Sequence, residues 1–167
     1  SNFLGFGFYK NCKDWKAKPL QDRKAKLHAK CKKVLCRKHG CAMPIAMLFT
    51  KLNQIVRGWI NYFRIGSMKK FITELGQWLR HKVRVVILKQ WKKAKTIYTN
   101  LQKLNNHYQC GFTHEDLYKV ANSRLGWYAR ANGDVVNYIL SPKYLGQANK
   151  KKGRPGLVNP LEYYLAK

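Results

Sequence analysis

The chain has 167 residues, of which 34 are lysine or arginine and only 7 are aspartate or glutamate, so its formal net charge is +27 at pH 7. Hydrophobic residues make up 46% of the sequence, which is enough for a packed core and excludes a simply disordered chain. The excess of positive charge favours a polyanionic partner, most commonly the phosphate backbone of a nucleic acid. An anionic membrane surface and an acidic protein are the weaker alternatives.

Membrane insertion is not expected. The longest wholly apolar run, residues 85–88, is far shorter than the roughly 20 residues that a spanning helix needs. No secretory signal pattern opens the sequence, and the five cysteines are an odd count that suits free thiols better than a disulfide framework. We therefore expect a reducing, cytoplasmic location.

Three of the cysteines lie near a histidine, an arrangement that invites comparison with zinc sites. The residues are Cys31, Cys36, His39 and Cys41. On a helix over residues 20–38, however, Cys31 and Cys36 point about 140° apart around the axis, and the usual paired spacing of zinc ligands is absent. We expect no metal site here, with Cys31 in the core and Cys36 on the surface.

The first 19 residues predict a short strand or hairpin arm followed by a linker. Residues 3–9 alternate and are rich in aromatics, as in a strand, but no second convincing strand pattern follows. Residues 10–19 are expected to be a polar connection, and Pro19 marks the entry to a helix.

Three helices are predicted over residues 20–95. The first covers residues 20–38 and ends before Gly40; the second runs from Pro44 to residue 65, before a stop at Gly66. Ser67 is a suitable N-cap for the third. Short connections at Gly40 and Gly66 favour an antiparallel bundle.

The second of these helices has two contrasting faces. Its apolar face carries Leu48, Leu52, Ile55, Val56, Trp59 and Phe63, and its polar face carries Asn53, Arg57, Asn61 and Arg64. Lysine, arginine and asparagine bind phosphate and ribose well, so the polar face is a candidate RNA contact. In the third helix the apolar pattern rotates at Ile87, Leu88 and Trp91, which indicates a second module packed on its other side.

Shorter helices are predicted beyond residue 95. They cover residues 96–104, 113–123 and 134–140, a further helix opened by Ser141 and Pro142, and residues 159–165, with a basic loop at 150–156. The fold class is therefore mainly all-α. A strand or hairpin with a linker (1–19) precedes a three-helix bundle (20–95) and a smaller, irregular helical module (96–167).

No catalytic constellation is evident. The seven carboxylates are scattered, and the adjacent pair Glu115 and Asp116 fits helix capping rather than metal binding. Neither metalloprotease nor nucleophile-elbow spacing is present. We expect a non-catalytic chain without a cofactor. Among the aromatics, Trp91, Trp127, Tyr128 and Tyr62 are not assigned to the core by spacing and could stack on bases.

Several short segments resemble the maturase-specific region of group II intron-encoded reverse transcriptases. They are Leu52-Asn53, Arg57-Gly-Trp-Ile-Asn-Tyr-Phe63, Lys89-Gln-Trp-Lys92, Gly126-Trp-Tyr128, Val136-Asn137 with Leu140-Ser141, and Gly156-Leu157. The strand at Phe3-Leu-Gly-Phe6 resembles the end of the polymerase palm in that family. The resemblance implies a three-helix thumb, also called domain X, followed by a C-terminal nucleic-acid-binding region.

The resemblance also implies partners and contacts. Group II intron RNA is the expected partner in splicing and retrohoming, with a template–primer duplex or target DNA and the palm as further ones. The Tyr-x-Asp-Asp motif of an RNA-directed DNA polymerase is absent from these residues, so magnesium is expected only for that palm and for the RNA. The nucleic-acid contacts we expect are Arg57, Asn61, Arg64, Lys69, Arg80, Arg84, Lys89, Lys92, Lys93, Arg124, Arg130, Lys150, Lys151 and Lys152.

Two other interpretations stay open at this point. The chain could be a basic structural module of a ribonucleoprotein, which neutralises RNA without assisting splicing. It could also be a complete metal-dependent nuclease whose active site includes Glu115 or Asp116, an interpretation that the scattered carboxylates disfavour.

Overall fold

The computed structural model describes residues 2–166, with the side chains of that range except those at positions 2, 3 and 37. Its first segment is an antiparallel sheet in the order β1-β2-β3, formed by β1 (Asn2–Phe3), β2 (Phe6–Lys10) and β3 (Trp15–Pro19). The prediction that residues 10–19 contain no strand is wrong, because β3 pairs with β2 from Lys10↔Trp15 to Phe6↔Pro19. Lysines alternate with Trp15, Ala17 and Pro19 on this mostly exposed edge strand, so its apolar pattern is weak.

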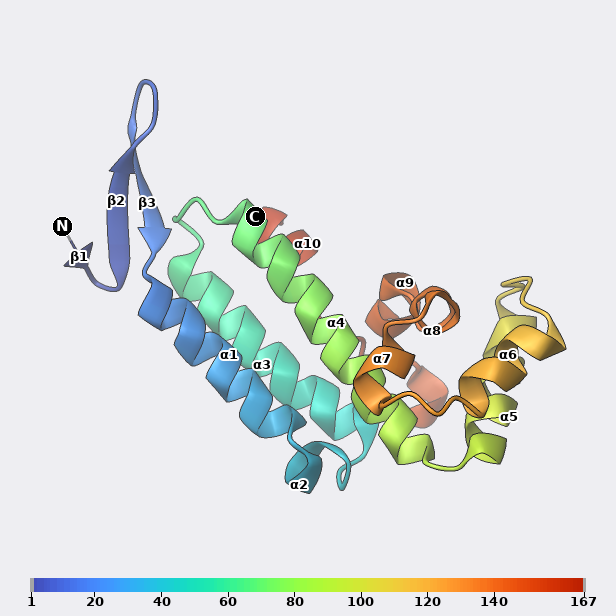
Figure 1. Cartoon of the computed structure of the whole chain (residues 1–167). Coiled ribbons are helices and arrows are strands. Elements are labelled where there is room, and N and C mark those ends of the chain that lie inside the picture. The colour runs from blue at the N-terminus through green and yellow to red at the C-terminus, as the bar shows by residue number, and fades with distance from the viewer. Residues whose placement is uncertain (1, 167) are drawn as a thin grey trace.

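Three long helices follow and lie side by side, as Figure 1 shows. They are α1 (Gln21–Leu35), α3 (Ile45–Phe63) and α4 (Lys69–Trp91), with the short α2 (Arg37–Gly40) between the first two. The predicted bundle is therefore confirmed. The first helix stops earlier than predicted, because Cys36 adopts an extended conformation with ψ of 154°.

The turn between α3 and α4 differs from the prediction in its capping. Ser67 does not cap α4; Met68 precedes the helix, and no side chain caps it. The Met68 side chain is buried, and the backbone N–H of Ser67 donates to the carbonyl of Ala17 at 2.8 Å. The turn is thus held by the core and by β3 rather than by a hydroxyl cap.

The core of the bundle follows the helical spacing of the sequence. Its fully buried side chains include Leu27, Cys31, Leu48, Phe49, Leu52, Val56, Ile60, Ile72, Leu75 and Leu79. Trp59 packs against Phe63 and Phe71, with ring centroids 4.6 and 5.4 Å away. No helix within residues 2–166 is both long and apolar enough to cross a membrane.

The second half of α4 is enclosed on all sides. Residues 83–88 are all buried, which confirms that a second module packs on the opposite face of this helix. The helix ends sooner than the predicted residue 95: Lys92 takes a positive φ of 62°, and the next helix, α5 (Ala94–His107), begins at once.

The second module consists of α5 and several short helices. These are α6 (His114–Ala121), α7 (Trp127–Ala131), α8 (Asp134–Ile139) and α9 (Pro142–Gly146). The expected capping box is present, since the Thr113 hydroxyl accepts from the Asp116 amide and the Asp116 carboxylate accepts from the Thr113 amide. Ser141 caps α9 as predicted, whereas α7 was not predicted.

The end of the chain returns to the bundle. The predicted basic loop is a compact turn, in which η1 (Lys150–Lys152) is closed by a bridge between Asn149 and Arg154. The chain then runs back to α10 (Pro160–Leu165), which packs against both α3 and α4 (Figure 1). The last helix therefore belongs spatially to the first module, although it follows the second in sequence.

Candidate nucleic-acid interface

The C-terminal segment, residues 156–165, packs along part of the polar face of α3. Asn53 is only 5% exposed; its Nδ2 donates to the carbonyl of Gly156 at 2.8 Å, and its Oδ1 accepts from the amide of Val158 at 2.7 Å. An asparagine that pairs with one N–H and one C=O imitates a neighbouring strand, so it fixes the extended segment before α10. Asn53 is therefore structural rather than an RNA contact.

Tyr163 of α10 sits over the rest of this polar face. Its hydroxyl donates to Oδ1 of Asn61 at 2.9 Å, and its carbonyl accepts from Nη2 of Arg64 at 2.7 Å. The guanidinium carbons of Arg57 and Arg64 lie 5.8 and 4.9 Å from its ring centroid. Arg64 is thus committed to an internal contact, whereas Arg57 and Asn61 stay exposed.

Of the two arginines predicted on the outer face of α4, Arg84 faces the second module instead, and Arg80 is partly buried near Glu162 of α10. Arg84 is buried, and its Nε donates to the carbonyl of Leu140 at 2.8 Å. Burial, with the nearby charge of Arg80, lowers the pKa of Arg84 to about 10, so the guanidinium stays protonated at neutral pH. Burial also lowers the pKa of Arg80, and the charge of Glu162 opposes that shift. The expectation that Arg84 lies on an outer surface is corrected.

Arg130 also makes internal contacts. Its Nη2 donates to the carbonyls of Val120 and Ala121 at 3.1 and 3.0 Å, and its guanidinium lies 4.6 Å from the Trp127 ring centroid. It therefore closes the C-terminal end of α6, where carbonyls lack helical partners. Burial lowers its pKa. Neighbouring Arg124 is exposed and forms no such bond within the described residues.

The remaining predicted contacts are surface cations. Lys69, Lys92, Lys93, Arg124, Lys150, Lys151 and Lys152 are exposed, and Lys89 is partly exposed. They do not converge on one point: Lys69 and Lys92 lie near opposite ends of α4, about 35 Å apart at 1.5 Å per residue. The structure therefore distributes these cations over a long surface instead of gathering them in one pocket.

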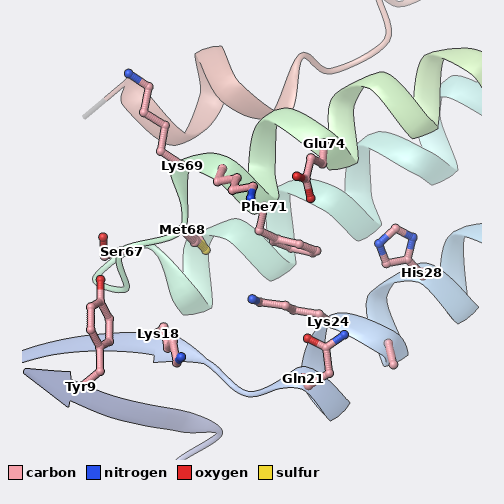
Figure 2. A pocket seen from close by; sticks show the side chains of 12 residues that line it. Tyr9, Lys18, Gln21, Lys24, His28, Ser67, Met68, Lys69, Phe71 and Glu74 are labelled. Carbon is pink, nitrogen blue, oxygen red and sulfur yellow. The ribbon is translucent and has the colours of Figure 1, made fainter.

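A cleft at the start of α4 brings together basic and aromatic side chains that the sequence did not single out (Figure 2). Its volume is about 720 Å³, and its lining combines β2, β3, α1 and α4 through Tyr9, Lys18, Lys24, His28, Lys69, Lys70 and Phe71. Nζ of Lys24 lies 4.9 Å from the Phe71 ring centroid, and Nζ of Lys18 lies 5.2 Å from that of Tyr9. Of these residues only Lys69 was predicted.

The cleft is cationic at neutral pH through its lysines rather than through its histidine. Burial, with the charge of Lys32, lowers the pKa of His28, which favours the neutral ring. Glu74 is the acidic residue among the lining. Strand β3 was not predicted from the sequence, and Lys18 was therefore not identified as a contact. The pairing of β3 with β2 places this lysine at the cleft.

Few cations are neutralised within the protein. Among the described residues there are two ion pairs, Asp22–Arg23 and Glu115–Lys119, both between exposed side chains. Asp116 serves the capping box, and the Thr113 hydrogen bonds lower the pKa of its carboxyl. The part of the chain that the structure describes contains no cluster of three metal-ligating side chains. The adjacent acids thus have structural partners.

The predicted burial of Cys31 and exposure of Cys36 are confirmed. All five are free thiols; Cys31 is fully buried and Cys36 is exposed. Burial raises the pKa of the Cys31 thiol to about 12, so it stays protonated in the folded chain. The predicted base-stacking aromatics are engaged in part: Tyr128 lies against His81, at 3.9 Å between ring centroids, and Trp127 lies under Arg130.

Comparison with known families identifies the region around the bundle. The family model for the group II intron maturase-specific domain matches residues 24–108, just over half of the chain and the region from α1 to the end of α5. A search of curated proteins found no match. The match covers the helical bundle and supports a maturase role in group II intron splicing, beyond that of a generic basic module. The chain therefore belongs to the group II intron maturase-specific domain family.

Proposed function

We propose that this chain binds group II intron RNA and thereby assists its folding for splicing. The observation that carries the proposal is the unneutralised charge of a folded body: 34 basic residues stand against 7 acidic ones, and two ion pairs join the described side chains. Such a surface gains affinity by releasing the counter-ions of a phosphate backbone. Structured RNA offers that backbone together with 2′-hydroxyl groups.

The cleft of Figure 2 is the proposed centre of this interface. Its four lysines come from three elements: Lys18 from β3, Lys24 from the neighbouring α1, and Lys69 and Lys70 from α4, which lies more than 40 positions later in the sequence. Lysine is a point charge that contacts phosphate without a fixed geometry, which suits recognition by shape and charge. The exposed Lys92, Lys93 and Lys150–Lys152 extend the proposed surface along the molecule.

The resemblance to group II intron reverse transcriptases suggests further roles, which we also propose. We propose that a template–primer duplex or target DNA uses the same basic surface during retrohoming, and that magnesium serves the RNA and a polymerase palm. We also propose that such a palm adjoins the hairpin end. Support comes from large apolar side chains exposed there, with Trp15 at 70% and Ile65 at 83%.

The proposal is tested by filter binding of the chain to a group II intron RNA. Replacing the four cleft lysines by glutamine should weaken binding by at least an order of magnitude, because four phosphate contacts are lost. A matched control replaces four exposed lysines outside the cleft, Lys26, Lys30, Lys95 and Lys103, and removes the same charge. Equal weakening in the two variants would refute a cleft-centred interface; no affinity of the unaltered chain for the RNA would refute RNA binding itself.

A further inference from the structure

A second concave region surrounds the start of α9, where three hollows adjoin. One is lined by Arg57 and Lys143, one by Arg80 and Arg84, and one by tyrosines; Pro142 lines all three. The first and third hollows also share Lys143, and the second and third share Asn137, so the three adjoin around α9; together they are called the groove. Its lining combines guanidinium and ammonium groups with the carboxylates of Glu74 and Glu162, and one end is aromatic.

The aromatic end has the size and lining of a ligand pocket. Its volume is about 540 Å³, within the range of small-molecule sites, and Tyr108, Tyr138 and Tyr144 line it. Tyr138 is 61% exposed, so a large aromatic surface faces solvent. Among the described residues that line this hollow, none is acidic.

The pocket walls are held in place by their neighbours. The rings of Tyr108 and Tyr144 meet edge to face at 5.7 Å between centroids, and the guanidinium of Arg154 lies 4.9 Å from that of Tyr144. The ring of Phe112 packs against Tyr138 in the same edge-to-face manner, at 5.5 Å. A ligand would therefore meet aromatic surfaces whose positions are already fixed, which reduces the entropic cost of binding.

Two amides give the pocket polar specificity. Nδ2 of Asn137 donates to the carbonyl of Asn132 at 3.0 Å, which leaves its Oδ1 as an acceptor. Oε1 of Gln147 accepts from the Tyr108 hydroxyl at 3.5 Å, which leaves its amide N–H groups as donors. An acceptor and a donor beside aromatic rings match the edge and face of a nucleobase.

We propose that this pocket binds one unpaired nucleobase of single-stranded RNA, whose flanking phosphates lie against the exposed side chains of Arg57 and Lys143. The inference rests on the proposed function and gives it a second, base-dependent site. The phosphate contacts supply affinity for any sequence, while the tyrosines and amides require that a base be present.

The test compares two RNAs by fluorescence anisotropy at one salt concentration: a short oligouridine and the same ribose–phosphate chain without bases. The unaltered protein should prefer the RNA with bases on the order of tenfold, as expected for one aromatic stack. Tyr138→Ala should remove most of this preference, with little change for the abasic chain. Tyr138→Phe should keep it, because the ring is retained.

Tyr118→Ala is the matched control, since Tyr118 is 55% exposed on α6 and does not line the groove. Its preference should equal that of the unaltered protein. Equal affinity of the unaltered protein for the two RNAs, or an undiminished preference in Tyr138→Ala, would overturn the base pocket. Binding to neither RNA would also overturn the base pocket, whereas the proposed function is refuted separately, by a lack of affinity for the intron RNA in filter binding.

Discussion

Replacing Asn53 by alanine removes the connection between α3 and the returning C-terminal segment. The variant loses two hydrogen bonds, of 2.8 and 2.7 Å, and leaves the amide of Val158 without its partner in a buried setting. An unsatisfied buried donor costs about 1–3 kcal/mol, and the lost bond to the partly exposed Gly156 adds to it, so we expect about 2–4 kcal/mol of destabilisation. This is a large share of the 5–15 kcal/mol typical of a domain.

The loss should be local before it is global. Hydrogen exchange monitored by mass spectrometry should show the amides of residues 156–165 exchanging on the order of a hundredfold faster in Asn53→Ala, because opening of this segment becomes easier. Urea unfolding measures the global effect. Asn106→Ala on α5 is the control, because this side chain is exposed and has no hydrogen bond among those of the described residues; its change should stay within about 0.5 kcal/mol. Indistinguishable behaviour of the two variants would refute the role given to Asn53.

Two further predictions concern buried and capping side chains. Burial raises the pKa of the Cys31 thiol from 9.0 to about 12, so the folded state holds this proton more firmly than the unfolded state. The raised pKa therefore stabilises the folded state fully below pH 9. Between pH 9 and about 12 this contribution to the free energy of unfolding falls by up to about 1.4 kcal/mol per pH unit. Urea unfolding across this pH range should show that the free energy of unfolding falls less steeply with pH in Cys31→Ala than in the unaltered protein. An equally steep fall in the two proteins would contradict the burial of this thiol. Arg130→Ala should lower stability by about 1–3 kcal/mol, because two carbonyls at the end of α6 lose their donor, whereas Arg124→Ala should change it by less than about 0.5 kcal/mol. Thermal unfolding of the two variants measures the difference, and similar unfolding midpoints for Arg130→Ala and Arg124→Ala would contradict the capping role of Arg130.

Local signals predicted most of the helical fold. Leu27 and Cys31, or Leu48, Leu52 and Val56, recur at helical spacing, and these side chains form the core. The Thr113–Asp116 box likewise depends only on residues within one turn. Such features are readable because a single element determines them.

Long-range contacts could not be predicted in the same way. The polar stripe of α3 was interpreted as an RNA contact, but Asn53 and Arg64 bind residues about a hundred positions later in the chain. Arg84 was placed on an outer face for the same reason, since nothing near it in sequence reveals that Leu140 accepts its Nε–H. A polar face with few acids is equally consistent with a docked segment and with a phosphate backbone. Only the fold distinguishes the two.

The central claim, that unneutralised lysines bind intron RNA, is tested most directly by the salt dependence of that binding. The logarithm of affinity should fall linearly with the logarithm of salt concentration, and loss of Lys18, Lys24, Lys69 and Lys70 should make the slope shallower by about 3, at 0.7–0.9 for each phosphate contact. The control variant at Lys26, Lys30, Lys95 and Lys103 should keep a slope closer to that of the unaltered chain. A salt-insensitive affinity, or an unchanged slope in the cleft variant, would contradict the account.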